Sequence, residues 1–150
     1  MLKYGSKIFN AQQMQSCERK GRRMNVLLVD DNEDYLNFMN ELLFLNGYTV
    51  LTATNGSEAC TMLDKPDIDL IISDIKMPTL DGIMLHAFAR ELERYKKTKF
   101  IFVSGYDDAL SDVLNLDPDI DFFFNKTTPV AELLKFIDGL LFGEFAGKWV

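Results

Sequence analysis

Strand-like and helix-like segments alternate along this chain from Asn25 onwards, and this alternation limits the possible folds more than any other feature. The strand-like segments are short apolar or β-branched runs, expected at 26–29, 48–54, 70–72, 100–103 and 120–124. Strands that alternate with helices over short connections require right-handed crossovers and a parallel sheet covered on both faces. The sequence therefore predicts one α/β domain, a single (βα)5 doubly wound parallel five-stranded sheet.

The expected helices are bounded by residues that favour helix ends. Ser57 is expected to cap the second helix, and Thr128 the last one, with Pro129 at its first helical position. In the third helix, the apolar spacing predicts a buried face made of Met84, Leu85, Phe88 and Leu92. A short, weak helix is expected at 108–116.

Charge and length divide the chain into three parts. The leader, 1–23, is basic and expected to be flexible or a frayed helix; the domain is expected at 24–142, and a short tail at 143–150. Residues 25–150 hold 10 basic and 22 acidic groups, and this net charge of −12 argues against nonspecific binding to nucleic acid. We expect a cytoplasmic protein without a membrane span, because two cysteines cannot build a disulfide framework and no long apolar run occurs.

Polar side chains follow the strands at the points where they end. Asp30 and Asp31 come after the first strand, Asp74 ends the third, Ser104 the fourth, and Lys126 follows the fifth. In a doubly wound sheet, ligands bind outside these carboxyl ends, where the strand order reverses. Crowded carboxylates favour a hard divalent cation such as Mg²⁺, and a carboxylate can also accept a phosphoryl group. A hydroxyl and an ammonium group can then bind the phosphoryl oxygens.

The sequence resembles a response-regulator receiver domain of two-component signalling (CheY-like) over about residues 25–142. The resemblance implies the flavodoxin-like strand order 2-1-3-4-5 for the sheet. The resemblance is carried by four motifs: Val29-Asp30-Asp31-Asn32, the block from Ser73 to Gly82 (Ser-Asp-Ile-Lys-Met-Pro-Thr-Leu-Asp-Gly), Val103-Ser104-Gly105, and Lys126. The block around Asp74 is the specific part, whereas a bare Asp-Asp pair is a weak signal.

The resemblance implies a phosphoacceptor and a set of metal ligands. Asp74 is the expected phosphoacceptor. Mg²⁺ is expected at Asp74 and Asp31, at Asp30 through a water molecule, and at the backbone carbonyl of Lys76. Mg²⁺ is the only cofactor expected.

The resemblance also implies residues that respond to phosphorylation. Ser104 and Lys126 are expected to bind the phosphoryl group, and Phe123 matches an aromatic position that turns inward on activation. A plain core phenylalanine is an equally good interpretation of Phe123. Lys76 and Tyr106 flank the path of a hydrolytic water molecule, and we expect these bulky side chains to slow dephosphorylation.

Two features depart from the usual receiver pattern. Lys126 is followed by Thr127 where receivers carry proline with a cis peptide bond, and we expect a trans bond here because a non-proline cis bond costs about 2.5–4 kcal/mol. Four acids lie within 112–121, where receivers commonly have small residues. Receivers normally dimerise or signal through this face, so an unusual choice of partner is expected.

The sequence favours a phosphoacceptor that takes phosphate from a histidine kinase or a histidine phosphotransfer protein. We expect a signalling receiver that catalyses the phosphorylation and dephosphorylation of its own aspartate, and not an enzyme. We expect it to signal by contact with a downstream protein partner or by forming a homodimer. About eight residues follow the last helix, too few for a DNA-binding domain. A pseudo-receiver that serves as an interaction module is the alternative. An aspartate-nucleophile phosphatase is disfavoured, because Lys76 stands where its general acid would be, and His86 is expected to be a partly buried or surface residue.

Overall fold

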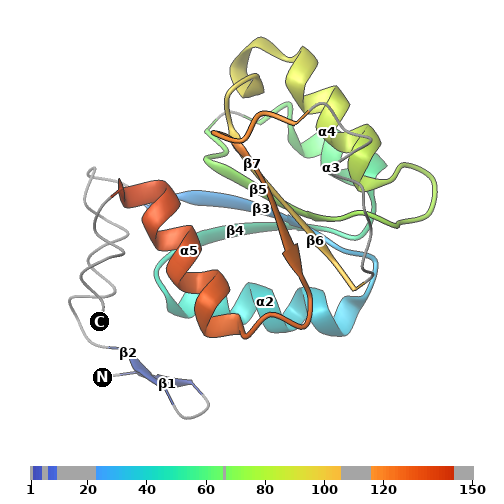
Figure 1. Ribbon diagram of the computed structural model, residues 1–150. Coiled ribbons are helices and arrows are strands. Elements are labelled where there is room, and N and C mark those ends of the chain that lie inside the picture. The colour runs from blue at the N-terminus through green and yellow to red at the C-terminus, as the bar shows by residue number, and fades with distance from the viewer. Residues whose placement is uncertain (1, 5–6, 10–22, 66, 106–115, 144–150) are drawn as a thin grey trace.

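A parallel five-stranded sheet forms the centre of the molecule in the computed structural model, which describes residues 2–4, 7–9, 23–65, 67–105 and 116–143 (Figure 1). Its strands are β3 (Asn25–Val29), β4 (Thr49–Ala53), β5 (Leu70–Asp74), β6 (Lys99–Ser104) and β7 (Asp121–Asn125). The strand order is β4-β3-β5-β6-β7. Every neighbouring pair is parallel. The predicted fold class and strand order are therefore confirmed.

Helices cover both faces of the sheet. They are α2 (Glu33–Leu45), α3 (Gly56–Met62), α4 (Gly82–Glu91) and α5 (Val130–Phe142), and a short 3₁₀ turn, η1 (Glu93–Tyr95), follows α4. In Figure 1, α2 and α5 lie on one face, while α3 and α4 lie on the other. Each helix pair encloses its own apolar core, so the sheet is buried on both sides.

The central strand β3 shows why the sequence forms a doubly covered sheet. Val26 and Leu28 enter the core beneath α2 and α5, whereas Leu27 and Val29 enter the core beneath α3 and α4. Successive side chains on a strand point to opposite faces, so a continuous apolar run fits only a strand with a core on each side.

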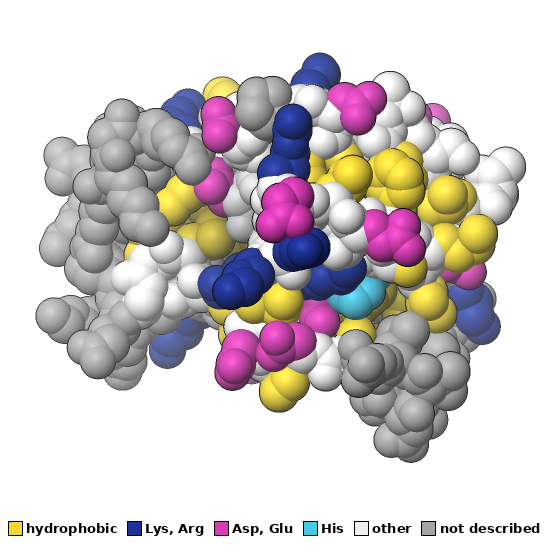
Figure 2. All heavy atoms as spheres, turned by 90° about the horizontal axis from the view of Figure 1, so that it is seen from above, with side chains coloured by type: hydrophobic (Ala, Val, Ile, Leu, Met, Phe, Trp, Pro, Cys, Tyr) yellow, Lys and Arg dark blue, Asp and Glu magenta, His cyan; other side chains and the backbone are white. Residues whose placement is uncertain are grey.

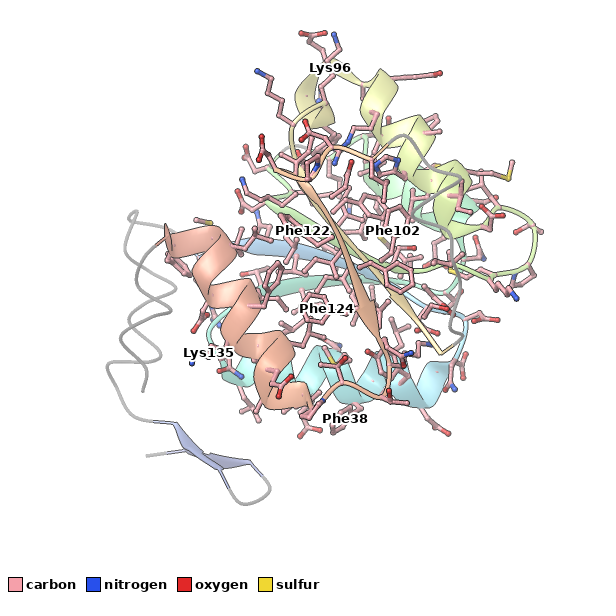
Figure 3. All side chains as sticks on the ribbon, in the orientation of Figure 1. Phe38, Lys96, Phe102, Phe122, Phe124 and Lys135 are labelled. Carbon is pink, nitrogen blue, oxygen red and sulfur yellow. The ribbon has the colours of Figure 1, made fainter. Side chains whose placement is uncertain are left out.

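On the α5 side of the edge strand β7, aromatic rings pack against one another. Phe122 and Phe124 lie beside α5 (Figure 3). Both rings contact Phe136 of α5, with centroid separations of 5.0 and 4.8 Å. These edge-to-face and tilted contacts anchor the last helix to the sheet next to the end of β7.

Asparagine side chains cap α2 and α3, although a hydroxyl group was expected to cap α3. Asn32 caps α2 by accepting the backbone N–H of Tyr35. Asn55, and not Ser57, caps α3, because it stands directly before the first helical residue and accepts the backbone N–H of Glu58 at 2.8 Å. The expectation for Ser57 was wrong by two positions.

The start of α5 also differs from the prediction. Pro129 occupies the cap position itself, and no side chain caps this helix, so Thr128 does not have the expected role. The ring of Pro129 fixes its φ at −54°, which leads the chain directly into the helix.

The buried face of α4 is rotated from the predicted one. Met84 and Phe88 are 53% and 39% exposed, while Leu85, His86 and Ala89 are buried. The cause lies at Gly82, where an added Cβ atom would stand 2.1 Å from the carbonyl oxygen of Asp74. This close approach presses the Gly82 side of the helix against the sheet, and the residues three, four and seven positions later face the core with it.

Two short segments of the leader lie within the described residues. Leu2–Tyr4 (β1) and Lys7–Phe9 (β2) form a two-stranded antiparallel sheet. The weak helix expected at 108–116, apart from Leu116, lies outside the described residues, as do Tyr106 and the tail at 144–150.

Candidate functional site

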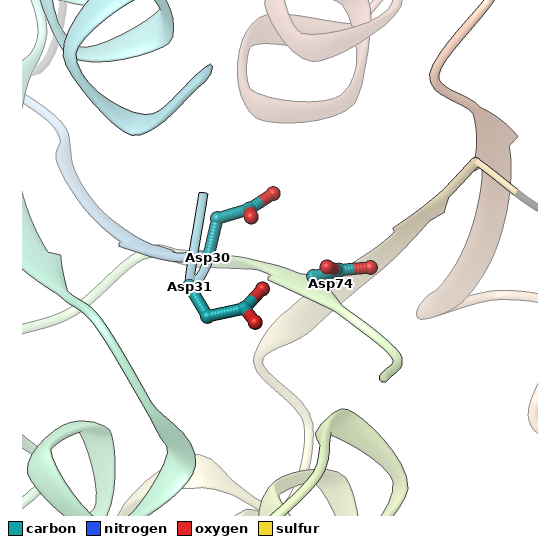
Figure 4. Close-up of side chains that lie close together, drawn as sticks. All are labelled: Asp30, Asp31 and Asp74. Atoms are coloured by element: carbon teal, nitrogen blue, oxygen red, sulfur yellow. The ribbon is translucent and has the colours of Figure 1, made fainter. Parts of the chain in front are cut away.

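Three carboxylates meet at the switch point of the sheet, at the carboxyl ends of the neighbouring strands β3 and β5. Asp30 and Asp31 follow β3, and Asp74 ends β5, which pairs with β3. One oxygen atom from each carboxylate lies within 4.8 Å of the others (Figure 4). Asp30 and Asp74 are buried, whereas Asp31 is exposed, so the cluster opens to solvent on the Asp31 side.

The ammonium group of Lys126 faces this cluster. Nζ of Lys126 lies 2.7 Å from Oδ2 of Asp30 and 3.4 Å from Oδ2 of Asp74. The backbone of Lys126 is held at the end of β6, because its N–H donates to the carbonyl of Ser104 at 2.8 Å. Burial alone would lower the pKa of Lys126, but its hydrogen bond to Asp30 and the charges of Asp30 and Asp74 outweigh burial and raise the pKa. The ammonium group therefore stays charged.

The pKa of Asp74 is raised by burial and then by the negative charge of Asp30. Lys126 and the backbone N–H of Ile75, which donates to Oδ1 of Asp74 at 2.8 Å, offset part of this increase. The three carboxylates carry more negative charge than the ammonium group of Lys126 neutralises by itself. A cation at this position would remove the repulsion that raises the pKa of Asp74.

The donor set fits magnesium. Mg²⁺ prefers oxygen ligands, binds proteins through one or two carboxylates, and retains several water molecules. The hollow beside the cluster is lined by Asp31, Asn32, Asp74, Lys76, Gly105 and Lys126. It is polar and open, so it offers space for water ligands next to the carboxylate oxygens.

Two glycines let the loop between β5 and α4 close over Asp74. At Gly82, the backbone N–H donates to the carbonyl of Ile75 at 2.8 Å, and no side chain would fit there. At Gly56, the N–H donates to the carbonyl of Leu80 at 3.1 Å, where an added Cβ would stand 2.2 Å from the same oxygen. The loop that carries Lys76 is thus held against α3 and the end of β5.

The two predicted switch residues lie in different environments. Ser104 is fully buried at the end of β6, directly before Gly105, which lines the hollow. Phe123 is 36% exposed on β7, which does not fit a plain core phenylalanine. The described residues contain no cis peptide bond, so Lys126–Thr127 is trans as expected.

Tyr35 belongs to the site and was missed in the sequence. The Lys126 ammonium lies 4.5 Å from the centre of its ring. Burial, followed by the charges of Asp30 and Asp74, raises the pKa of Tyr35 to about 12, so the phenol is neutral at physiological pH. Its position in the first turn of the helix after Asp31 was the available signal, because that turn begins at the carboxyl edge of the sheet.

The chain matches a family model described as response regulator receiver domain over residues 26–138. It belongs to this family. Receiver domains are signalling modules of two-component systems, and the CheY-like fold expected from the sequence is confirmed. The matched range contains every carboxylate of the cluster, together with Ser104 and Lys126.

Relatives of this receiver include larger regulators. It is 31% identical over 121 residues to the transcriptional regulatory protein TrcR of Mycobacterium tuberculosis, covering 81% of this chain and 46% of that one. It is 32% identical over 120 residues to a probable transcriptional regulator, ycf27, of Cyanidium caldarium, covering 80% of this chain and 47% of the other. The chain spans about half the length of the curated relatives it matches.

Solved receiver structures match it along nearly their whole length. Chemotaxis protein CheY4 of Vibrio cholerae matches with a TM-score of 0.72 and 27% identity, covering 79% of this chain and 98% of that one. Response regulator TrrA of Thermotoga maritima, solved in complex with Mg²⁺ and BeF, matches with a TM-score of 0.66 and 28% identity, covering 79% and 99%. None of the helices in the described part of this receiver is long and apolar enough to cross a membrane.

Proposed function

We propose that this receiver accepts a phosphoryl group on Asp74 in a Mg²⁺-dependent reaction. The observation that carries the proposal is the unbalanced cluster, in which three carboxylates lie within 4.8 Å of one another at the switch point. Asp74 suits the role of acceptor because it ends β5 at the polar hollow and its Oδ2 lies within 3.4 Å of a lysine ammonium. Asp30, Asp31, Asp74 and the backbone carbonyl of Lys76 are the groups we expect to hold Mg²⁺, which neutralises charge on the phosphoryl oxygens when bound.

The transfer exchanges one bond to phosphorus for another. A carboxylate oxygen of Asp74 attacks the phosphorus atom and forms an acyl phosphate, while the bond between phosphorus and the donor's leaving group breaks. With phosphohistidine as the donor, the phosphorus–nitrogen bond breaks and the free imidazole takes a proton. The ammonium of Lys126 and the hydroxyl of Ser104 would then bind the new phosphoryl oxygens.

The proposed donor is a histidine kinase or a histidine phosphotransfer protein in the cytoplasm. The proposed output is contact with a downstream protein or a second copy of this chain. In this proposal Phe123, exposed on β7, is the side chain whose position reports phosphorylation. Lys76, which lines the hollow, and Tyr106 are proposed to slow hydrolysis of the acyl phosphate.

Intact-mass spectrometry after incubation with acetyl phosphate and Mg²⁺ tests the proposal. The wild-type protein is expected to gain one phosphoryl group, and to gain none when the metal is chelated. Asp74→Asn is expected to gain none under either condition. Asp34→Asn, which changes an exposed acid in the first turn of α2, is the matched control and is expected to react like the wild type.

A folded wild-type protein that gains no phosphoryl group would contradict the proposal and favour the pseudo-receiver alternative. The observation that favours this alternative is the closer contact of the Lys126 ammonium with Asp30, at 2.7 Å, than with Asp74, at 3.4 Å. In a pseudo-receiver, this lysine would neutralise the cluster permanently, and Mg²⁺ would bind weakly.

A further inference from the structure

The ammonium group of Lys126 has a third neighbour besides the two carboxylates. The ring of Tyr35 lies with its centre 4.5 Å from Nζ, well within the range of a cation–π contact. Lys126 follows β7, and Tyr35 belongs to the first turn of α2. The contact therefore joins the end of the edge strand to a helix on one face of the sheet. The lysine head is therefore held from the α2 side as well as from the carboxylate side.

Tyr35 is itself fixed by the first residues after β3. The backbone N–H of Asn32 donates to Oδ1 of Asp30 at 2.9 Å, and Oδ1 of Asn32 accepts the backbone N–H of Tyr35 at 3.2 Å. The ring of Tyr35 faces Lys126, whose ammonium returns to Oδ2 of Asp30 at 2.7 Å. Asp30, Asn32, Tyr35 and Lys126 therefore contact one another in turn, and the series of contacts begins and ends at the buried Asp30.

A ring face suits this position for a physical reason. The two carboxylates attract the lysine in different directions, and the shorter distance is to Asp30. A ring attracts the charge through its quadrupole without accepting a conventional hydrogen bond, so the N–H donors remain available to oxygens at Asp74. Lys126 has a long, flexible side chain, and the contact with the Tyr35 ring restrains its ammonium end. The peptide bond from Lys126 to Thr127 is trans.

We propose that Tyr35 is a positioning residue, whose ring holds the Lys126 ammonium where it can bind a phosphoryl group on Asp74. This role rests on the proposed function of Asp74 as phosphoacceptor and adds a determinant of how strongly the phosphoryl oxygens are bound. It predicts that the aromatic face of Tyr35, and not its hydroxyl group, supports this binding.

Fluoroberyllate with Mg²⁺, used as a phosphoryl mimic, tests the proposal by titration calorimetry. Tyr35→Leu, which keeps an apolar side chain but removes the ring, is expected to bind fluoroberyllate about 3- to 10-fold more weakly than the wild type. Tyr35→Phe, which keeps the ring, is expected to restore the affinity. Phe38→Leu, the same kind of change three residues further along α2 at an exposed side chain, is the matched control and should leave the affinity unchanged.

A double-mutant cycle separates this role from general packing. In a Lys126→Met background, Tyr35→Leu is expected to change the remaining affinity by less than about twofold, because the charge that the ring holds is absent. An equal loss in both backgrounds would overturn the proposal and assign Tyr35 a packing role.

Nuclear magnetic resonance of the ε-methylene group of Lys126 gives a readout that does not depend on phosphoryl chemistry. Ring currents should shift its protons upfield in the wild type and in Tyr35→Phe, and the shift should disappear in Tyr35→Leu. If the wild type and Tyr35→Leu bind fluoroberyllate equally well, the inference about Tyr35 is overturned, but the proposed function of Asp74 is not. A wild type that binds no fluoroberyllate would overturn the proposed function as well, and the upfield shift would then show only the contact.

Discussion

Two clusters of charged side chains lie at opposite ends of the same sheet, and they differ in charge balance. At the carboxyl ends of β3 and β5, the three carboxylates of Asp30, Asp31 and Asp74 lie near the ammonium group of Lys126. At the amino end of β7, the carboxylate of Asp121 lies between two basic side chains from α4, His86 and Arg90. The carboxylates of the first cluster outnumber the charge of Lys126, whereas the carboxylate of the second has two basic partners.

Both oxygens of the Asp121 carboxylate have partners within hydrogen-bond distance. Oδ1 lies 2.8 Å from Nε2 of His86 and 2.6 Å from Nη2 of Arg90, while Oδ2 accepts the backbone N–H of Asp117 at 2.9 Å. The His86 ring also contacts Phe100, with its centre 4.9 Å away. Figure 2 shows the histidine, in cyan, beside Lys and Arg side chains in dark blue.

The two carboxylates respond to these surroundings in opposite directions. Burial raises the pKa of Asp74, and the charge of Asp30 raises it further. Burial would also raise the pKa of Asp121, but the N–H of Asp117 and the hydrogen bonds from Arg90 and His86 outweigh burial and lower it. A satisfied buried carboxylate supports the fold, whereas an unsatisfied cluster is available for a ligand.

Removing the satisfied carboxylate should have the largest effect on stability. Asp121→Ala is expected to lower the free energy of unfolding by about 3 kcal/mol, because it leaves Arg90 and His86 without their buried partner. Urea unfolding measures this loss. Asp119→Ala, at an exposed neighbouring acid, should change stability by less than about 0.5 kcal/mol, and an equal loss in both variants would remove the distinction.

Mg²⁺ should stabilise the protein through the other cluster. At a free concentration ten times its dissociation constant, a ligand that binds only the folded state adds about 1.4 kcal/mol to the free energy of unfolding. We expect this gain in the wild type and in Asp121→Asn, and a much smaller gain in Asp31→Asn. Thermal unfolding with and without Mg²⁺ measures it, and an undiminished gain in Asp31→Asn would place the metal elsewhere.

Acid should weaken the satisfied cluster by a smaller amount. Because the pKa of Asp121 is lower in the folded state than the ordinary value of about 3.9, the unfolded state binds more protons in that range. The contribution of Asp121 is complete above that value and is lost as pH falls through the folded pKa. Urea unfolding from pH 7 to pH 3 measures the free energies of unfolding of the wild type and Asp121→Asn. The difference between the two free energies should become smaller at low pH, and a difference that stays constant would contradict this.

The smallest expected effect has the opposite sign. Asp74→Asn removes repulsion with Asp30 and keeps an oxygen acceptor for the backbone N–H of Ile75, so we expect a gain of about 0.5–1 kcal/mol without Mg²⁺. Urea unfolding in the presence of a chelator measures it. A loss of stability would mean that Asp74 is as well satisfied as Asp121.

The comparison also explains what could be predicted from the sequence. The parallel sheet, and the approach of Asp30 and Asp74 at its carboxyl edge, follow from short connections and the topology of such sheets, which depend on local patterns. The strand order was expected from the resemblance to receiver domains. His86 was expected to be partly buried or at the surface, and it is buried instead, because the rotation of α4 depends on the contact of Gly82 with the carbonyl of Asp74.

Tyr35 shows the same limit within the site. Its helix is visible in the apolar spacing, but the contact with Lys126 joins two residues 91 positions apart in the sequence. Asn55 instead of Ser57 as a cap is a difference of two residues that local propensity does not resolve, because both side chains favour this position.

Locating the phosphoryl group tests the central claim that the unbalanced cluster acts through Asp74. The protein is phosphorylated with acetyl phosphate and Mg²⁺, the acyl phosphate is reduced with borohydride, which converts the modified aspartate into homoserine, and the peptides are sequenced by mass spectrometry. We predict homoserine at position 74 alone. Homoserine at Asp30 or Asp31, or at no position in a folded protein, would contradict the account.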